Sequence, residues 1–302
     1  MKRFHSFCTD CNIFTPFPLT EQLLCTFAAF LADQGLAPQT IKSYLSAVRN
    51  MQISLGLPDP RDQSSMPRLK RVQAGIARLR MLKGTAPRVR LPITPHVLSR
   101  IHDFLSSSPD QDKTVILAVA TTAFFGFFRL GELLPTSTAA FNLTMDLAWG
   151  DVAVDNRQNP RMLQIHLKTS KTQQFGPGVD VVLGTTGTTL CPVTAMVQYI
   201  KERGSQPGAF FLSPAKTALT KAQFVSRIRA ILQLLGLPHC DYAGHSFRIG
   251  AATTAASMGV EDSMIQTLGR WHSAAFLQYI RMPKEQLAAM SAVLATSSPR
   301  QT

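Results

Sequence analysis

The sequence predicts a mainly helical chain with one small antiparallel β-sheet, an α+β fold in two domains. Apolar residues recur at helical spacing through most of the 302 residues, for example at Leu23, Phe27 and Leu31. Three short runs with β character interrupt this pattern in the middle of the chain. A stretch with two Pro and no apolar period lies near residue 90 and separates the two helical parts. A chain of this length also suits two domains.

Residues 1–84 are expected to form a helical domain. Its first clear helix is closed by Gly35 and Pro38, a second helix opens near Thr40, and a third runs over about 67–83. In the third helix the apolar stripe is flanked almost entirely by Lys and Arg. This domain therefore combines its own apolar core with an unusually basic surface.

Basic charge is concentrated in this first part of the chain. The formal net charge is +13 and the isoelectric point is about 10.0. Residues 1–92 hold 13 Lys or Arg against 5 Asp or Glu. Such a balance favours a polyanion, either nucleic acid or an acidic membrane surface, and a nearly all-basic helix face favours phosphate contacts over ordinary solvation. The candidate DNA contacts are Lys42, Arg68, Lys70, Arg71, Arg78, Arg80 and Lys83, followed by Arg88 and Arg90 in a linker over residues 85–93.

Several other classes of protein fit the sequence poorly. The five Cys are odd in number and scattered, which does not suit a disulfide framework. His5, Cys8 and Cys11 are spaced like half of a zinc site, but no second pair lies nearby in the sequence, so no metal is expected. The N-terminus lacks the apolar run of a signal peptide. The most apolar stretch, residues 115–128, is too short to span a bilayer and is typical of a buried helix, so no membrane partner is expected.

The second domain is expected over residues 94–296, with a tail at 297–302. It opens with a helix capped by Thr94, and a buried helix follows that ends in an Arg-Leu-Gly-Glu run. Arg129 at the end of an apolar helix needs a partner, and Glu132 is one candidate. Two interpretations remain open: an internal ion pair, or an Arg that reaches an anion while Glu132 orients it.

The three β-like runs span residues 147–154, 162–167 and 179–183. Between the last two runs lies a hairpin loop that closes with Gly-Pro-Gly and carries Lys168 and Lys171. An isolated lysine in a loop is usually only solvated. The loop therefore indicates a functional site only in combination with the other motifs.

The stretch Ala-Gly-His-Ser-Phe-Arg-Ile-Gly and the run after it hold groups suited to one phosphate. His245 and Arg248 are three apart, so a helix that opens here places both on one face. Arg binds phosphate oxygens as a planar fork, and His and Trp supply ring donors. A Gly-Arg-Trp-His run with Trp271 and His272 follows, and then Tyr279, whose hydroxyl can attack phosphorus.

His-x-x-Arg followed about thirty residues later by Tyr resembles the C-terminal signature of the tyrosine recombinases, the phage integrases and their relatives. The wording HSFRIGAATTAA, then LGRW and YIR, is most similar to eukaryotic transposon-borne members, the DIRS-type retroelements and cryptons. Arg-x-x-Glu after the apolar helix and Ser-Lys-Thr in the hairpin loop match other motifs of that family. The resemblance implies a helical, SAM-like core-binding domain that contacts DNA, followed by a tyrosine-recombinase catalytic domain.

The resemblance also implies a role for each site residue. The two arginines hold the non-bridging phosphate oxygens, the tyrosine attacks phosphorus to give a 3′-phosphotyrosine, and the lysine protonates the leaving 5′-oxygen. The histidine contacts the phosphate and helps to take the tyrosine proton. Lys168 remains an alternative to Lys171, and His272 an alternative to Trp271. The implied catalytic set is Arg129, Lys171, His245, Arg248, Trp271 and Tyr279, with Glu132 and His272 in supporting positions.

The motifs together predict a site-specific recombinase or integrase of a mobile element, acting on double-stranded DNA without a metal or other cofactor. The resemblance further implies tetrameric self-association on DNA and a nuclear location. A C-terminal helix predicted over residues 284–294 is expected to pack either on a neighbouring protomer or on its own domain. Residues 1–7 read as the end of a helix, so we expect a longer gene product or a trimmed domain. Two alternatives remain: a DNA-binding descendant without activity, and a type IB topoisomerase, which shares the phosphotyrosine chemistry.

Overall fold

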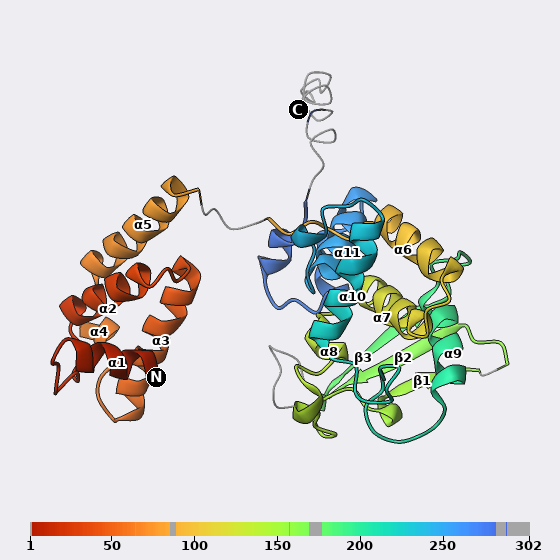
Figure 1. Cartoon of the computed structure of the whole chain (residues 1–302), viewed down its shortest axis with the longest axis horizontal. Coiled ribbons are helices and arrows are strands. Elements are labelled where there is room, and N and C mark those ends of the chain that lie inside the picture. The colour runs from red at the N-terminus through yellow and green to blue at the C-terminus, as the bar shows by residue number, and fades with distance from the viewer. Residues whose placement is uncertain are drawn as a thin grey trace, which may run out of the picture. The chain divides into compact units, whose positions relative to one another are not determined.

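The chain folds as an N-terminal unit, Met1–Arg88, and a C-terminal unit, Val89–Thr302, both drawn in Figure 1. The computed structural model describes residues 2–63, 65–84, 89–156, 158–168, 177–281 and 288. Helices dominate both units, and the C-terminal unit also holds a small antiparallel sheet. The predicted α+β fold class is therefore confirmed.

The helices of the N-terminal unit pack around a core rich in Phe. Phe4 and Phe7 of the first helix and Phe27 of the second are at most 3% exposed. The Phe27 ring centroid lies 5.0 Å from that of Phe4 and 5.1 Å from that of Phe7. Tilted and edge-to-face pairs of this kind add to the area that the rings bury. The described helices are α1 (Lys2–Asp10), α2 (Glu21–Asp33), α3 (Pro38–Ser54), α4 (Pro60–Gln63) and α5 (Pro67–Leu82).

The boundary between α2 and α3 differs from the prediction. The sequence predicts that Pro38 closes one helix and that the next opens near Thr40. In the structure Pro38 is the first residue of α3. Proline is favourable at this position because its missing N–H has no intrahelical partner to lose and its φ already suits a helix. Gly35, with φ +75°, alone supplies the turn after α2.

The C-terminal unit is built around α7, a helix that is apolar on all sides. α7 packs against α6, α9 and α11, and its middle is buried throughout. Figure 1 shows the sheet toward one end of this unit and α11 toward the other. Among the described residues, no helix has both the length and the apolar character that a membrane crossing requires. The helices are α6 (Pro95–Ser107), α7 (Lys113–Phe125), α8 (Leu130–Leu133), α9 (Pro192–Arg203), α10 (Lys221–Leu234), α11 (Ser246–Ser257) and α12 (Asp262–Leu268), with 3₁₀ turns at Thr138–Ala140, Trp149–Asp151, His239–Asp241 and Ala274–Gln278.

The sheet pairs β1 (Val152–Val154), β2 (Met162–Leu167) and β3 (Val179–Gly184) antiparallel in that order. Alternate residues of β2 are buried, as expected for a sheet with one face on the core. The first strand is shorter than the predicted run over 147–154. Residues 149–151 form a 3₁₀ turn instead, because the Asp151 carboxylate accepts a 2.7 Å hydrogen bond from the Ala148 N–H and bends the chain there.

The chain that enters the C-terminal unit lies against the start of α11. The Leu91 N–H donates to the Asp241 carbonyl at 3.0 Å, and the Ile93 N–H donates to the Ser246 carbonyl at 2.9 Å. Gly250 makes room for this contact, because a Cβ at that position would lie 1.8 Å from the Ile93 carbonyl oxygen. The predicted linker therefore ends packed on the helix that carries the His-x-x-Arg motif. The predicted helix over 284–294 lies outside the described residues apart from Ala288.

We expect Gly250→Ala to destabilise the C-terminal unit by about 1–3 kcal/mol, because the added methyl group overlaps backbone that cannot move without disturbing the chain entry. Scanning calorimetry of the full chain measures this. The matched control is Gly184→Ala in the same unit, where an added Cβ meets nothing within 4 Å. Its unfolding free energy should change by less than about 0.5 kcal/mol. Equal unfolding temperatures for the two variants would contradict the close approach at Gly250.

Candidate active site

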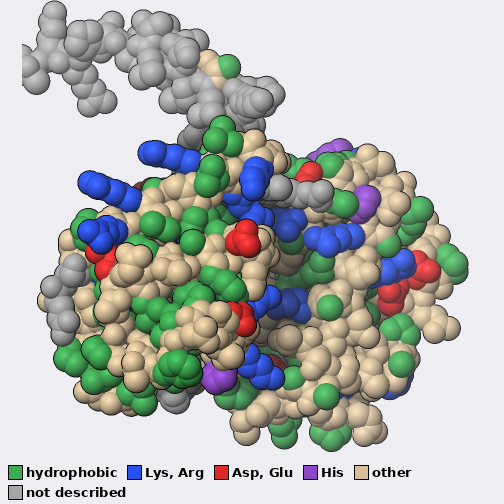
Figure 2. All heavy atoms as spheres, turned by 60° about the vertical axis from the view of Figure 1, so that its left-hand side comes forward, with side chains coloured by type: hydrophobic (Ala, Val, Ile, Leu, Met, Phe, Trp, Pro, Cys, Tyr) green, Lys and Arg blue, Asp and Glu red, His purple; other side chains and the backbone are tan. Residues whose placement is uncertain are grey.

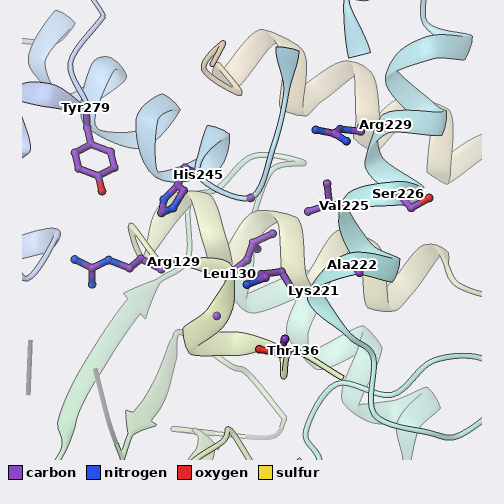
Figure 3. A pocket seen from close by; sticks show the side chains of 12 residues that line it. Arg129, Leu130, Thr136, Lys221, Ala222, Val225, Ser226, Arg229, His245 and Tyr279 are labelled. Atoms are coloured by element: carbon purple, nitrogen blue, oxygen red, sulfur yellow. The ribbon is translucent and has the colours of Figure 1, made fainter. Parts of the chain in front are cut away.

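A cavity of about 850 Å³ opens on the C-terminal unit, and side chains distant in sequence line it. Figure 3 shows Arg129, His245 and Tyr279 on one side and residues of α10 on the other. The Tyr279 side chain extends into the space between the other two. Three of the predicted site residues therefore share one cavity wall, although 150 positions separate the first from the last.

Arg129 lies where the chain turns from α7 into α8. It is the N-cap of α8, and its N–H donates to Glu132 Oε2 at 2.9 Å. Its guanidinium Nη1 donates to Glu132 Oε1 at 2.8 Å. The internal Arg129–Glu132 pair is present in the structure, and Arg129 also lines the cavity. Contact of Arg129 with an anion stays a prediction.

Arg248 lies deeper, on the first turn of α11. Its side chain is 0% exposed, and Nη1 donates to the Phe127 carbonyl at 2.5 Å while Nη2 donates to the Gly269 carbonyl. The guanidinium lies 4.0 Å from the Trp271 ring centroid and 5.6 Å from that of Tyr279. Burial, with the nearby charge of Arg129, lowers the pKa of Arg248 to about 9, so it stays protonated at pH 7. Arg248 thus lies behind the tyrosine rather than on the cavity wall.

Trp271 lies between the buried arginine and the tyrosine, whereas His272 is exposed. The Trp271 and Tyr279 ring centroids are 5.2 Å apart, and the Trp271 side chain is 7% exposed. Its indole Nε1 is buried and has no hydrogen-bond partner in the described part of the chain. A buried donor without a partner is uncommon in proteins, and ligand binding is one way to satisfy it. Of the two candidates, the structure places Trp271 within the site.

Tyr279 is anchored to α11 through Thr253, a residue that the sequence reasoning missed. The Thr253 hydroxyl donates to the Tyr279 carbonyl at 3.2 Å and accepts from the Arg281 N–H at 3.0 Å. The Tyr279 ring centroid lies 6.3 Å from that of His245, which precedes the same helix as its N-cap. One helix therefore positions Arg248, His245 and the backbone of the tyrosine.

Of the two lysines of the hairpin loop, the structure describes Lys168 alone. Lys171 lies outside the described residues. Lys168 Nζ lies 2.5 Å from Asp151 Oδ2, and it donates to the carbonyls of Leu143 at 2.8 Å and Asp146 at 3.2 Å. Its three ammonium hydrogens thus have three acceptors within the fold, and Lys168 anchors the base of the hairpin.

The far wall of the cavity adds basic residues that the sequence analysis did not select. Lys221 and Arg229 of α10 line it together with Ser226. The Arg229 Nε donates to the Tyr242 carbonyl at 2.8 Å. Their eight-residue separation along one helix face was a readable signal, since such residues lie two turns apart on the same side. The cavity is therefore basic on both walls.

The predicted DNA-contacting residues of the N-terminal unit mostly present exposed side chains. Arg80 is half-buried and donates to the Gly35 carbonyl at 3.1 Å. Arg88 lies outside the described residues, and Arg90 belongs to the C-terminal unit, where it donates to the Cys240 carbonyl at 2.9 Å. Lys and Arg side chains are spread over the face drawn in Figure 2. The exposed members are Lys42, Arg68, Lys70, Arg71, Arg78 and Lys83.

Cys8, part of the half zinc site considered from the sequence, is buried, and burial raises the pKa of its thiol. His5 and Cys11 are exposed. In the described ranges, no three His, Cys, Asp or Glu side chains gather in a way that could hold a metal ion.

The sequence and the structure of this chain are similar to those of several known proteins. No family model matches the chain. An integrase/recombinase described as a xerD homolog, from Selenomonas ruminantium, is 24% identical over 269 residues, which cover 86% of this chain and 72% of that protein. The XerH site-specific recombinase, in a post-cleavage complex with a palindromic difH substrate, matches with a TM-score of 0.64 and 16% identity over 97% of this chain and 77% of its own. The Tn1549 transposon integrase, in complex with transposon right end DNA, matches with a TM-score of 0.59 and 14% identity over 98% and 92%.

The structural matches at such low identity establish the fold, and the sequence relative extends over most of both chains. The motif residues that suggested the family lie together at one site in the C-terminal unit. The chain has the fold of these solved recombinases and is similar in sequence to an integrase/recombinase.

Proposed function

We propose that this protein is a site-specific DNA strand transferase that cuts and rejoins DNA through a 3′-phosphotyrosine. One observation supports this most directly: Arg129, His245 and Tyr279 line one cavity, and Arg248 and Trp271 pack directly behind the tyrosine. A hydroxyl nucleophile surrounded by guanidinium groups and ring donors suits attack on a phosphodiester, because the pentacoordinate transition state gains negative charge.

In this mechanism the Tyr279 oxygen forms a bond to phosphorus and the bond to the 5′-oxygen of the next nucleotide breaks. Arg129 stabilises the developing charge from the cavity wall. His245 takes the tyrosine proton. Arg248 joins the phosphate only when the groups around it, Trp271 and Tyr279 among them, shift, since the arginine has no exposed surface in this structure. The phosphotyrosine keeps the energy of the broken bond, so religation needs neither nucleotide nor metal.

The general acid that protonates the leaving 5′-oxygen is assigned to Lys171. This choice is supported by the other hairpin lysine, because Lys168 already has Asp151 and two carbonyls as acceptors. An alkoxide leaves poorly, and a positioned acid is worth on the order of 10²–10⁴ in rate.

The DNA is proposed to pass between the two basic walls of the cavity, with Lys221 and Arg229 near phosphates that flank the cleaved one. The basic surface of α5 is proposed as a further phosphate contact. Integration of a eukaryotic mobile element, a nuclear site of action and a tetrameric assembly on DNA complete the proposal. They are supported by the HSFRIG and Gly-Arg-Trp wording of the sequence.

Tyr279→Phe is expected to abolish covalent protein–DNA adduct formation, because it removes the nucleophilic oxygen and little else. The assay incubates the full chain with nicked DNA that carries the target site, then separates adducts under denaturing conditions. DNA affinity should be unchanged. An adduct that persists in Tyr279→Phe would show that another residue attacks, and no adduct from the unmodified chain would favour a DNA-binding protein without activity.

Lys171→Ala is expected to slow adduct formation on the order of 10²–10⁴-fold with ordinary DNA. A substrate with sulfur in place of the leaving 5′-oxygen should restore the rate, because a thiolate leaves without protonation. Lys168→Met should instead lower the unfolding temperature, because it leaves the mostly buried Asp151 carboxylate without its cation. Restoration by the sulfur substrate in Lys168→Met but not in Lys171→Ala would exchange the two assignments.

Thr253→Val is expected to slow adduct formation about tenfold or more while DNA affinity stays the same, because the backbone at Tyr279 and Arg281 loses its two hydrogen bonds to α11. Thr253→Ser keeps the hydroxyl and is the matched control, with a rate near that of the unmodified chain. Single-turnover kinetics at saturating protein measures the difference. Identical rates for Val and Ser would show that this anchor does not position the nucleophile.

A further inference from the structure

We propose that Arg270 is a positioning residue for strand transfer: it holds the Glu132 carboxylate and, through it, the guanidinium of Arg129 at the cavity. This inference rests on the proposed function. Arg270 is absent from the residues that line the cavity, whereas Arg129, which shares the Glu132 carboxylate with it, lines the cavity.

The Glu132 carboxylate is shared between two arginines. Its side chain is 6% exposed. Oε1 accepts from Arg129 Nη1 at 2.8 Å, and Oε2 accepts from the Arg129 N–H at 2.9 Å and from Arg270 Nη2 at 3.1 Å. With both oxygens engaged, the carboxylate cannot rotate without breaking a charge-assisted hydrogen bond. Arg270 therefore limits where the Arg129 guanidinium can lie.

Arg270 also binds the turn that precedes Arg129. Its Nη1 donates to the Gly126 carbonyl at 3.0 Å, its Nη2 to the Phe127 carbonyl at 3.4 Å, and its guanidinium lies 4.8 Å from the Phe128 ring centroid. The Phe127 carbonyl is the same acceptor that Arg248 uses. One side chain thus supports the turn that carries the first catalytic arginine and the acceptor that holds the second.

Arg270 adopts a strained backbone conformation. Its φ is +56°, a left-handed conformation that costs a residue with a side chain free energy and that Gly adopts readily. The preceding Gly269 has an ordinary φ. The strain is thus carried by the arginine rather than by its glycine neighbour. The left-handed turn directs the guanidinium back toward Glu132.

Direct phosphate binding by Arg270 is the competing explanation. Its side chain is 14% exposed, and its two terminal nitrogens already donate to Glu132 and to carbonyls. Burial lowers the pKa of Arg270, with Glu132 opposing that effect. A guanidinium held in this way is built into the fold, and its partners would have to be broken before a phosphate could replace them.

The test compares three quantities for the full chain: DNA affinity, the single-turnover rate of adduct formation on nicked target DNA, and the unfolding temperature. Arg270→Lys keeps the charge but loses the planar fork. We expect it to slow adduct formation on the order of 10- to 100-fold, with DNA affinity unchanged. Arg227→Lys is the matched control, because Arg227 likewise bridges two carboxylates, Asp110 and Asp112, outside the catalytic set. Its rate should equal that of the unmodified chain.

A double-mutant cycle with Glu132→Gln decides how Arg270 acts. If it acts through the carboxylate, Arg270→Lys should cost little further rate once Glu132→Gln is present. Multiplied effects, or a loss of DNA affinity in Arg270→Lys, would overturn the proposal and favour direct phosphate contact. If Arg270→Lys fails to fold, Glu132→Gln alone must still slow adduct formation at unchanged DNA affinity. A rate equal to that of the unmodified chain would overturn the proposal that the Glu132 carboxylate positions Arg129. An unmodified chain that forms no adduct contradicts the proposed function instead.

Discussion

The arrangement of the site depends on how the fold holds buried guanidinium groups at the turn between α7 and α8. Arg248 is fully buried, and it shares the Phe127 carbonyl with Arg270. Burying a cation costs several kcal/mol unless its hydrogens find acceptors. Phe127 and Arg270 both have left-handed backbones, with φ +52° and +56°, and these conformations bring the acceptors and the cations together. The two turns and α11 must therefore keep their mutual positions for any of these charges to be tolerated.

α11 joins this cation cluster to the rest of the reaction. Its first turn carries Arg248, its Gly250 accepts the entering chain at Ile93, and Thr253 holds the backbone at Tyr279. Small residues along this helix allow those close contacts, since larger side chains would push the neighbouring backbone away. A single rigid element thus sets the distance between the nucleophile and the buried arginine. This explains why substitutions far from the reacting atoms are expected to change the rate rather than DNA affinity.

The nucleophile and the deep arginine are neighbours in this structure. The Arg248 guanidinium lies 5.6 Å from the Tyr279 ring centroid and has no exposed surface. Under the proposed mechanism, the second phosphate-binding arginine must become accessible when the tyrosine moves toward phosphorus.

The sequence by itself determined the fold class and the residues that suggested the chemistry. Helical periodicity identified the core helices, and spacing placed His245 and Arg248 on one face where a helix opens, because both signals are local. Local patterns misjudged the start of α3 at Pro38 and the length of the first strand, where the Asp151 carboxylate accepts a hydrogen bond from the Ala148 N–H and bends the chain.

Only the tertiary structure decided which polar residues serve the site indirectly. Arg270 looked like part of a Gly-Arg-Trp motif, yet its partner Glu132 lies 138 positions earlier. Lys168 became an anchor of the fold because Asp151, beside the neighbouring strand β1, binds it, and Lys221 and Arg229 joined the cavity because α10 forms the wall opposite Arg129. Sequence spacing reports neighbours within one element. Contacts between elements depend on how those elements pack. The packing therefore decides whether a polar side chain lines the cavity, stabilises the fold or positions another residue.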